Sequence, residues 1–243
     1  MKICVAQTRP VKGNIQKNIE HHKQLIAIAV SCKADAIIFP ELSLTGYEPG
    51  LAKALATHPD DFRFDDFQKI SDIHHMTIGV GVPTKNNSGI CISLLLFQPQ
   101  CARQIYSKRY LHQDEEAFFV SGQNISDITV KQIPLALAIC YEISVPQHRE
   151  AAVSSGAKIY VASVAKFVSG IDKALDSLSE IARTSSMTVL MSNCVGASDG
   201  DICAGKTSIW NEKGLLLGQL DDTHEGILLL DTDAQEVVAK YVK

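Results

Sequence analysis

The stretch Ile133–Pro146, IPLALAICYEISVP, runs from an unbroken apolar segment into a cysteine, a tyrosine and a carboxylate. Its aliphatic side chains after Pro134 are typical of a buried strand, and α/β proteins often place functional groups where such strands end. Cysteine is also among the most frequently buried residues, so Cys140 taken alone is more simply explained as part of the core. The rest of the chain has to decide between these two interpretations.

The segments before and after this strand show both helix and strand patterns. Residues 2–11 alternate as a strand, residues 14–33 repeat apolar side chains at helical spacing, and residues 36–39 indicate a second buried strand. Residues 90–100 and 102–111 are two strand patterns joined by a Pro-containing turn without room for a helix, which predicts a mixed sheet. Further helices are expected at 67–75, 146–157 and 170–186.

These elements predict an α/β fold in one domain that covers residues 1–243. The expected architecture is a four-layer α-β-β-α sandwich, with two mixed β-sheets back to back and helices on the outer faces. Residues 206–233 indicate a closing, hairpin-rich section around a turn at Asn211–Gly214. Repeats, linkers and low-complexity segments are absent from the sequence.

The composition excludes several classes of function. A net charge of -4 with scattered lysines gives no basic surface for nucleic acid or anionic lipid, and no segment approaches the roughly 20 apolar residues of a membrane helix. The seven cysteines include no CxxC pair, and neither His21–His22 nor His74–His75 can face one metal from a regular helix. We therefore expect a soluble, cytoplasmic protein with reduced thiols and without a metal site.

Three predicted strand ends carry polar side chains that an apolar core would not hold without a reason. Glu41 follows IIFP, Lys108 lies within IYSKRYL, and Cys140 follows LALAI. If these strands are neighbours, the three groups converge as a nucleophilic site in which Glu41 is the general base and the ammonium group favours the thiolate. Lys108 and the backbone N–H of Tyr141 would then stabilise an oxyanion.

The residues around these three positions resemble the motifs of a known family. FPELSLTGY (39–47), YSKRYL (106–111) and ICYE (139–142) are similar to the glutamate, lysine and cysteine motifs of the nitrilase superfamily of carbon–nitrogen hydrolases, whose triad is Glu-Lys-Cys. SNCVG and GKTSIWNEKG are similar to later segments of the same family, so the resemblance covers nearly the whole chain. It implies that Glu41, Lys108 and Cys140 are catalytic, that no metal or organic cofactor is needed, and that the protein is a homodimer packed through the helices after Cys140 and Lys166.

The family also has a second glutamate between its lysine and its cysteine, in a segment that ends in a glycine. Here HQDEEAFFVSG contains both Glu115 and Glu116, and Glu115 lies seven residues before Gly122, which is the spacing that resembles the family pattern. We therefore expect Glu115 to position the lysine or a water molecule. Adjacent side chains of an extended segment point to opposite sides, so Glu116 should face away as a solvated charge. If the segment is instead a helical turn, the two directions differ by about 100° and the contrast is weaker.

Other positions bear on the substrate. The family usually has a bulky, Pro-rich loop where this chain has Val164-Ala165-Lys166, so Lys166 is either a second cation for a substrate carboxylate or an ordinary solvated lysine. Tyr47 lies on a Gly-Pro loop that could line the mouth of the pocket or simply be exposed. Glu142 either shapes the substrate site or caps the turn after the cysteine.

The resemblance implies a cysteine-dependent hydrolase of non-peptide carbon–nitrogen bonds that forms a thioester at Cys140. Its substrate is expected to be a small-molecule amide, of the ω-amidase or N-carbamoyl amidase type. The tyrosine after the cysteine resembles the amidase branches more than the true nitrilases, so hydrolysis of a nitrile through a thioimidate is the alternative. A catalytically silent binding protein on the same fold is a further alternative, against which the complete triad argues.

Overall fold

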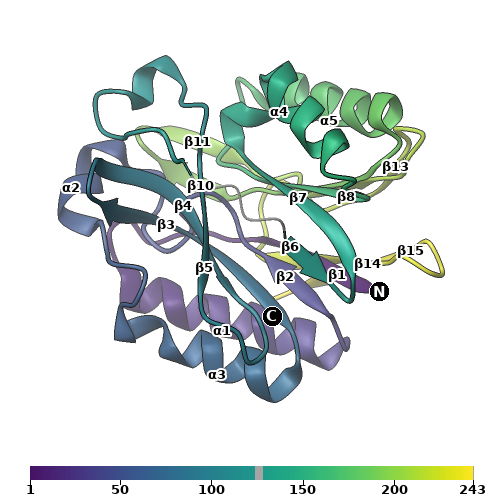
Figure 1. The fold of residues 1–243 in the computed structure, drawn as a ribbon, viewed down its shortest axis with the longest axis horizontal. Helices are drawn as coiled ribbons and strands as arrows, with labels where there is room; N and C mark the ends of the chain where they lie inside the picture. Colours follow the sequence, from purple (N-terminus) through teal and green to yellow (C-terminus); the bar gives the residue numbers. More distant parts are fainter. Residues whose placement is uncertain (124–127, 243) are drawn as a thin grey trace.

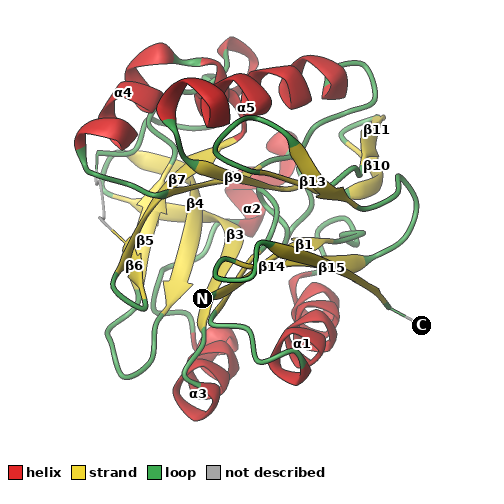
Figure 2. Cartoon of the chain, turned by 90° about the vertical axis from the view of Figure 1, so that its right-hand side faces the viewer, coloured by secondary structure: helices red, strands yellow, loops and turns green. Residues whose placement is uncertain are grey.

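The chain forms four layers, with two β-sheets face to face and helices on both outer faces (Figures 1 and 2). The computed structural model describes residues 1–123 and 128–242. Figure 2 shows α1 (Ile15–Ser31) and α3 (Asp65–His74) on one outer face, and α4 (Pro146–Ser154) and α5 (Ile171–Ser185) on the other. The α-β-β-α sandwich predicted from the sequence is therefore confirmed.

The first sheet has seven strands and is mixed, as predicted. Its centre is parallel, because β1 pairs with β2 and β2 with β3 in the same direction, whereas the outer pairs are antiparallel. In spatial order the strands are β15 (Glu236–Tyr241), β14 (Gly226–Asp231), β1 (Lys2–Gln7), β2 (Ala36–Ile38), β3 (Thr77–Asn86), β4 (Gly89–Phe97) and β5 (Gln104–Ser107).

The second sheet has six strands and a parallel centre of β7, β8 and β9. The closing section of the sequence divides between the sheets: β12 and β13, joined by the predicted Asn211–Gly214 turn, belong here, whereas β14 and β15 extend the first sheet. In spatial order the strands are β13 (Leu216–Gln219), β12 (Ser208–Trp210), β9 (Thr188–Ser192), β8 (Ile159–Ser163), β7 (Ile133–Ile139) and β6 (Ile128–Val130). A separate hairpin, β10 (Val195–Ser198) and β11 (Asp201–Ala204), and the short helix α2 (Ala52–Leu55) were not predicted.

Three apolar clusters fill the spaces between the layers. Alternating side chains of the two sheets meet in the middle, including Val5, Ile38, Leu137 and Val161. The opposite faces of the same strands pack on the helices, because successive side chains of a strand point to opposite sides. Phe39 and Ile78 belong to the cluster under α1 and α3, and Tyr160, Leu178 and Val189 to the cluster under α4 and α5.

Two buried serine hydroxyls tie the ends of strands in one sheet to the ends of strands in the other. Ser163, the last residue of β8, donates to the carbonyl oxygen of Phe39 at 2.8 Å, and Ser192, the last residue of β9, donates to that of Ala6 at 2.6 Å. Because β7 and β8 are parallel neighbours, the residues that follow β2 and β7 are brought to the same edge of the sandwich. Functional groups at these strand ends can therefore meet.

Gly81 in β3 allows the turn after β2 to pass directly over the neighbouring strand. A Cβ at this position would lie 2.2 Å from the carbonyl oxygen of Pro40 and 2.5 Å from the backbone nitrogen of Leu42. Leu42 itself has a φ of 50°, in the left-handed region that is costly for a residue with a side chain. The absence of a side chain at Gly81 therefore makes room for the tight turn that carries Glu41.

We predict that Gly81→Ala lowers the free energy of unfolding by about 3 kcal/mol, because the added methyl group must displace backbone atoms in a packed core. Gly50→Ala is the matched control, since nothing lies within 4 Å of the Cβ that it would add. Urea denaturation measures both variants. Equal stability of the two would contradict the close approach.

Candidate active site

The ammonium group of Lys108 lies between two carboxylates in the interior of the protein. Its Nζ is 2.8 Å from Oε1 of Glu41 and 2.6 Å from Oε1 of Glu115, and the three side chains are 0–2% exposed. Burial disfavours the ammonium group, but the charge of Glu41 and the other anionic neighbours outweigh it and raise the pKa of Lys108 above its ordinary value. Lys108 is therefore a fixed positive charge, placed directly after β5.

Glu41 uses only one of its carboxylate oxygens. Oε1 accepts from Lys108, whereas Oε2 is buried and has no hydrogen-bond partner within residues 1–123 and 128–242. Burial raises the pKa of the Glu41 carboxyl, and the opposing effect of Lys108 offsets this only in part. A carboxylate with a free oxygen and a raised pKa is suited to accept a proton from a neighbouring group.

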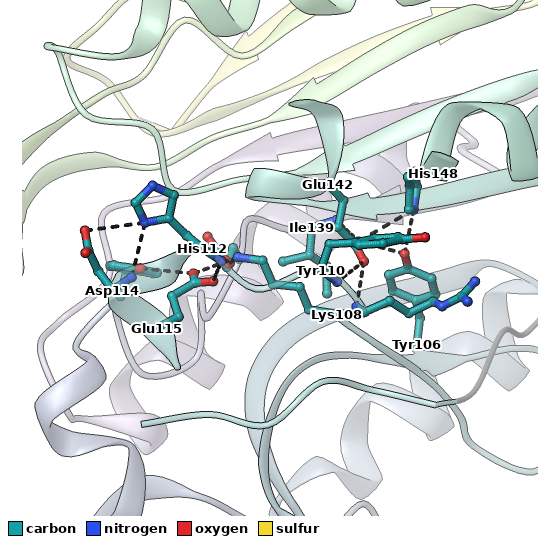
Figure 3. Close-up of polar contacts among 12 residues, drawn as sticks. Tyr106, Lys108, Tyr110, His112, Asp114, Glu115, Ile139, Glu142 and His148 are labelled. Carbon is teal, nitrogen blue, oxygen red and sulfur yellow. Dashed lines mark hydrogen bonds and ion pairs between the residues drawn. The ribbon is translucent and has the colours of Figure 1, made fainter. Parts of the chain in front are cut away.

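Glu115, in contrast, has both carboxylate oxygens occupied. Oε1 accepts from Lys108 and from the Tyr47 hydroxyl at 3.1 Å, and Oε2 accepts from the backbone N–H of His112 at 2.8 Å (Figure 3). The segment is not extended, as the sequence suggested, but forms a short 3₁₀ helix, η3 (Gln113–Glu115). Glu115 nonetheless lies beside Lys108, and Glu116 is exposed.

Gly122 allows the segment that carries Glu115 to lie against the strand end that carries Lys108. Its N–H donates to the carbonyl oxygen of Lys108 at 2.7 Å. A Cβ at Gly122 would lie 2.5 Å from both the Cβ and the carbonyl oxygen of Ser107, so a larger residue would push the two segments apart. The spacing from Gly122 was the reason to expect Glu115 rather than Glu116 beside Lys108. Gly122 does contact the strand end that carries Lys108.

Cys140 lies where β7 turns into a 3₁₀ helix, η4 (Cys140–Ser144). Its φ of 44° places it in the left-handed region, which is strained for a non-glycine residue and is often found at functional sites. The first N–H groups of a helix have no partner within that helix, and the N–H of Tyr141 is one of them. The turn thus combines a thiol with a backbone donor that the helix itself leaves without a partner.

The electrostatic environment keeps the thiol of Cys140 protonated at neutral pH. Burial and the charge of Glu41 raise its pKa to about 11, whereas Lys166 and Lys108 act in the opposite direction. The sequence analysis expected Lys108 to favour the thiolate, and its effect does have that sign, but it is outweighed. Cys140 therefore needs a base to take its proton when it reacts, and Glu41 is the charge with the largest influence on it.

Cys140 opens into a cavity of about 630 Å³. Glu115, Tyr47 and Lys166, each expected near the substrate, line this cavity, and so does Tyr141. Lining residues that the sequence analysis missed are His112, Asp114, Phe118, Phe167 and Asp199. His112, Asp114 and Phe118 lie within three residues of Glu115, which is the signal that could have found them, and Asp199 on the β10–β11 turn lies shortly after the SNCVG segment.

Glu142 lies outside this cavity, so its expected place among the substrate-binding residues is not supported. Its side chain is fully buried and accepts from the Tyr106 hydroxyl at 2.7 Å, from Arg109 N–H at 2.6 Å and from Ile139 N–H at 2.7 Å (Figure 3). The bond to Ile139 caps η4, which was the alternative interpretation. The bond to Arg109 joins the residue after Lys108 to the strand end of Cys140.

The described groups include several that nucleophilic catalysis uses. They are a thiol that lines the cavity, a carboxylate with one free oxygen, a buried ammonium group and a backbone N–H at the start of η4, although Glu41 and Lys108 are not among the residues that line the cavity. Within residues 1–123 and 128–242, no group of three or more His, Cys, Asp and Glu side chains could hold a metal ion. None of the helices in these ranges has the length and apolar composition to cross a membrane.

We predict that alkylation of Cys140 by iodoacetamide accelerates about tenfold per pH unit from pH 7 to pH 10, because the thiolate fraction rises tenfold per unit below the pKa. With a pKa raised to about 11, no plateau should appear in this range. Mass spectrometry of the modified peptide gives the rate, with Cys140→Ala as the blank. A plateau below pH 9 would show that the site holds a preformed thiolate.

We predict that Glu142→Gln lowers the free energy of unfolding by about 2–4 kcal/mol, because an amide can no longer accept on both sides and each lost buried partner costs about 1–3 kcal/mol. Glu150→Gln, on the exposed side of the neighbouring helix α4, is the matched control and should change stability little. Thermal and urea unfolding measure both. If the two variants are equally stable, Glu142 does not hold the two strand ends together.

Comparison with known proteins places the chain in a family. The profile of the carbon–nitrogen hydrolase family matches residues 2–240. The chain is 22% identical over 248 residues to a glutamine-dependent NAD(+) synthetase of Thermotoga maritima, covering 97% of this chain but only 42% of the synthetase. It is 22% identical over 244 residues to an (R)-stereoselective amidase of a Pseudomonas species, covering 96% of this chain and 86% of the amidase.

Among solved structures, an amidase from Nesterenkonia sp. AN1, determined as a variant in complex with butyramide, superposes with a TM-score of 0.87. The identity is 22%, and the match covers 97% of this chain and 92% of that chain. This likeness concerns the fold, whereas the family match rests on the sequence. The protein is thus a member of the carbon–nitrogen hydrolase family.

Proposed function

We propose that the protein is a cysteine-dependent amidohydrolase of small amides, with Glu41, Lys108, Cys140 and Glu115 as its catalytic groups. The observation that carries the proposal is the fully buried Lys108, held between Glu41 and Glu115. Glu115 lines the cavity into which Cys140 opens, whereas Lys108 and Glu41 are not among its lining residues. A buried cation is costly and a structural role alone gives no reason to place it beside a thiol. An acyl-transfer site needs such a charge where negative charge develops.

In the proposed reaction, Glu41 Oε2 takes the proton of the Cys140 thiol while the sulfur attacks the amide carbon. Lys108 and the N–H of Tyr141 stabilise the resulting oxyanion. The protonated Glu41 then gives its proton to the leaving nitrogen, so that ammonia or an amine departs and a thioester remains on Cys140. Glu41 next takes a proton from water as the water oxygen attacks the thioester carbon. The C–S bond then breaks, and Glu41 returns the proton to the sulfur, which frees the carboxylic acid and restores the thiol.

The two glutamates are suited to different roles, because Glu41 has a free carboxylate oxygen and Glu115 has none. Glu115 already accepts from Lys108, Tyr47 and His112, so it is suited to position the ammonium group rather than to carry protons. Glu41 keeps one oxygen free and has the raised pKa of a group that changes protonation state. This assigns the acid and base steps to Glu41 alone.

Amides are favoured over nitriles by the tyrosine after the cysteine and by the relatives. The Nesterenkonia amidase is recorded with butyramide and, in another variant, with the acetamide moiety of fluoroacetamide covalently added at its active-site cysteine. A relative named Nitrilase 1 from Arabidopsis thaliana is 25% identical over 188 residues, covering 68% of this chain. The candidate substrates are therefore ω-amido acids, N-carbamoyl amines and simple primary amides. The expected homodimer stays a prediction.

The test is ammonia release from a panel of primary amides, ω-amido acids, N-carbamoyl amines and nitriles. We expect the wild-type protein to hydrolyse an amide, folded Cys140→Ala to be inactive, and Glu115→Gln to lose most of its kcat, since a buried charge loses its partner at a cost of about 3–5 kcal/mol. Glu116→Gln, one residue away but exposed, is the matched control and should keep full activity. Turnover by folded Cys140→Ala, or turnover of nitriles alone, would refute the amidohydrolase.

A further inference from the structure

A second, smaller cavity of about 190 Å³ adjoins the cavity of Cys140. The two share four lining residues, namely His112, Tyr141, Lys166 and Gly170. A molecule whose reacting carbon lies at Cys140 can therefore extend past Tyr141 into the second space. What lines that space bears on the part of the substrate that does not react.

The lining of the second cavity is basic. It contains Lys166 and Lys173 together with serine and apolar side chains, and no carboxylate. The two solvent-facing carboxylates of the first cavity, Asp114 and Asp199, are absent from it, and the third, Glu115, is already paired with Lys108. The charge of the lining thus changes from mixed in the first cavity to positive in the second.

The ammonium groups of Lys166 and Lys173 make no structural contact in the part of the chain that the structure describes. Within residues 1–123 and 128–242, the hydrogen bonds of Lys166 and Lys173 involve only their backbone atoms, and neither forms an ion pair. Lys173 is exposed, whereas Lys166 is partly buried. An unpaired cation in a partly enclosed site binds an anion more strongly than one in open solvent, because water screens it less.

The backbone of Lys166 is fixed by a buried amide. The fully buried Asn193 accepts from Lys166 N–H at 2.8 Å and donates to the Lys166 carbonyl oxygen at 3.2 Å. Ala204 N–H donates to the same carbonyl at 2.9 Å, and Asn193 also donates to Gly205. A cation on a fixed backbone loses little further freedom when it binds a ligand, which favours affinity.

Lys166 is also close enough to act on the reacting group. Its charge lowers the pKa of the Cys140 thiol more than that of Lys108 does, and it also lowers the pKa of Glu41. Cys140 and Lys166 also line the same cavity, so one small molecule in that cavity can contact both. A group bound at Lys166 and a carbon attacked by Cys140 can belong to one molecule.

We propose that Lys166 binds a carboxylate of the substrate, so that the amides hydrolysed are those of short dicarboxylic acids. This inference rests on the proposed amidohydrolase and names the substrate class of the same site. Lysine donates to a carboxylate as a compact point charge, and such a charge-assisted bond fixes the end of the molecule opposite the reacting amide. Lys173, at the open end of the second cavity, adds to the positive potential.

The experiment compares ω-amido acids of increasing length with neutral primary amides of matched length, by kcat/KM from ammonia release. We expect an ω-amido acid to be the better substrate at one chain length, and Lys166→Met to lower its kcat/KM by about 10- to 100-fold more than that of its neutral partner, mainly through KM. The effect of Lys166 on the thiol cancels in the ratio of the two kcat/KM values, because both substrates react with the same thiol.

Lys158→Met is the matched control, because Lys158 is exposed just before β8 whereas Lys166 lies beyond the other end of that strand. It should leave the ratio unchanged, Lys166→Arg should retain part of the preference, and Lys166→Glu should favour ω-amino amides. A second readout is calorimetric binding of glutarate and succinate to Cys140→Ala. This binding should weaken with added salt and be lost when Lys166→Met is added.

The two proposals fail in different ways. If neutral amides are hydrolysed through Cys140 but ω-amido acids are not preferred, or if Lys166→Met leaves the ratio unchanged, the carboxylate site is wrong and the amidohydrolase stands. If dicarboxylates bind to Cys140→Ala in a Lys166-dependent manner but no amide is hydrolysed, the carboxylate site stands and the proposed reaction is wrong.

Discussion

The burial of one ammonium group is the constraint on which the site depends. Lys108 is fully enclosed, and a charge in that position is stable only if its partners are brought to it with good geometry. Those partners come from the end of β2 and from a short helix that follows β5, so two separate segments must converge on the same atom. The close contacts at Gly81 and Gly122 serve this convergence, because each lets a backbone segment pass where a side chain would block it.

The same charge cluster helps to explain why the Cys140 thiol is protonated at neutral pH. Two carboxylates surround a single ammonium group, and burial together with the charge of Glu41 raises the pKa of the Cys140 thiol. A negative sulfur near Glu41 would add a further unpaired charge to a buried site. In the proposed reaction the proton would therefore pass from sulfur to carboxylate as the bond to carbon forms, and Lys108 would stabilise the resulting oxyanion.

The sequence could predict the groups that lie at strand ends, because strand periodicity and breakers such as Pro40 are local signals. Glu41, Lys108 and Cys140 stand out in this way, whereas Glu115 is singled out only because its spacing from Gly122 resembles the pattern of the family. Sequence could not predict the side to which Glu142 turns, since its donors from Tyr106, Arg109 and Tyr110 lie on a distant segment and Ile139 precedes a turn whose backbone is strained at Cys140. The 3₁₀ turn at Glu115 and the second cavity likewise arise from tertiary packing, for which no periodic pattern exists.

Glu115 and Lys166 both line the pocket, but different kinds of interaction hold them in place. One side chain is needed for the fold, and the other is not. On the wall that Glu115 lines, its carboxylate belongs to a buried ionic cluster with Lys108 and Glu41, so the loss of one group leaves a buried charge uncompensated. On the opposite wall, the neutral amide of Asn193 fixes the backbone at residue 166 and leaves the side chain of Lys166 without a structural task. A side chain in that position can vary while the backbone stays in place. The charge that it carries is therefore free to match the substrate rather than the fold.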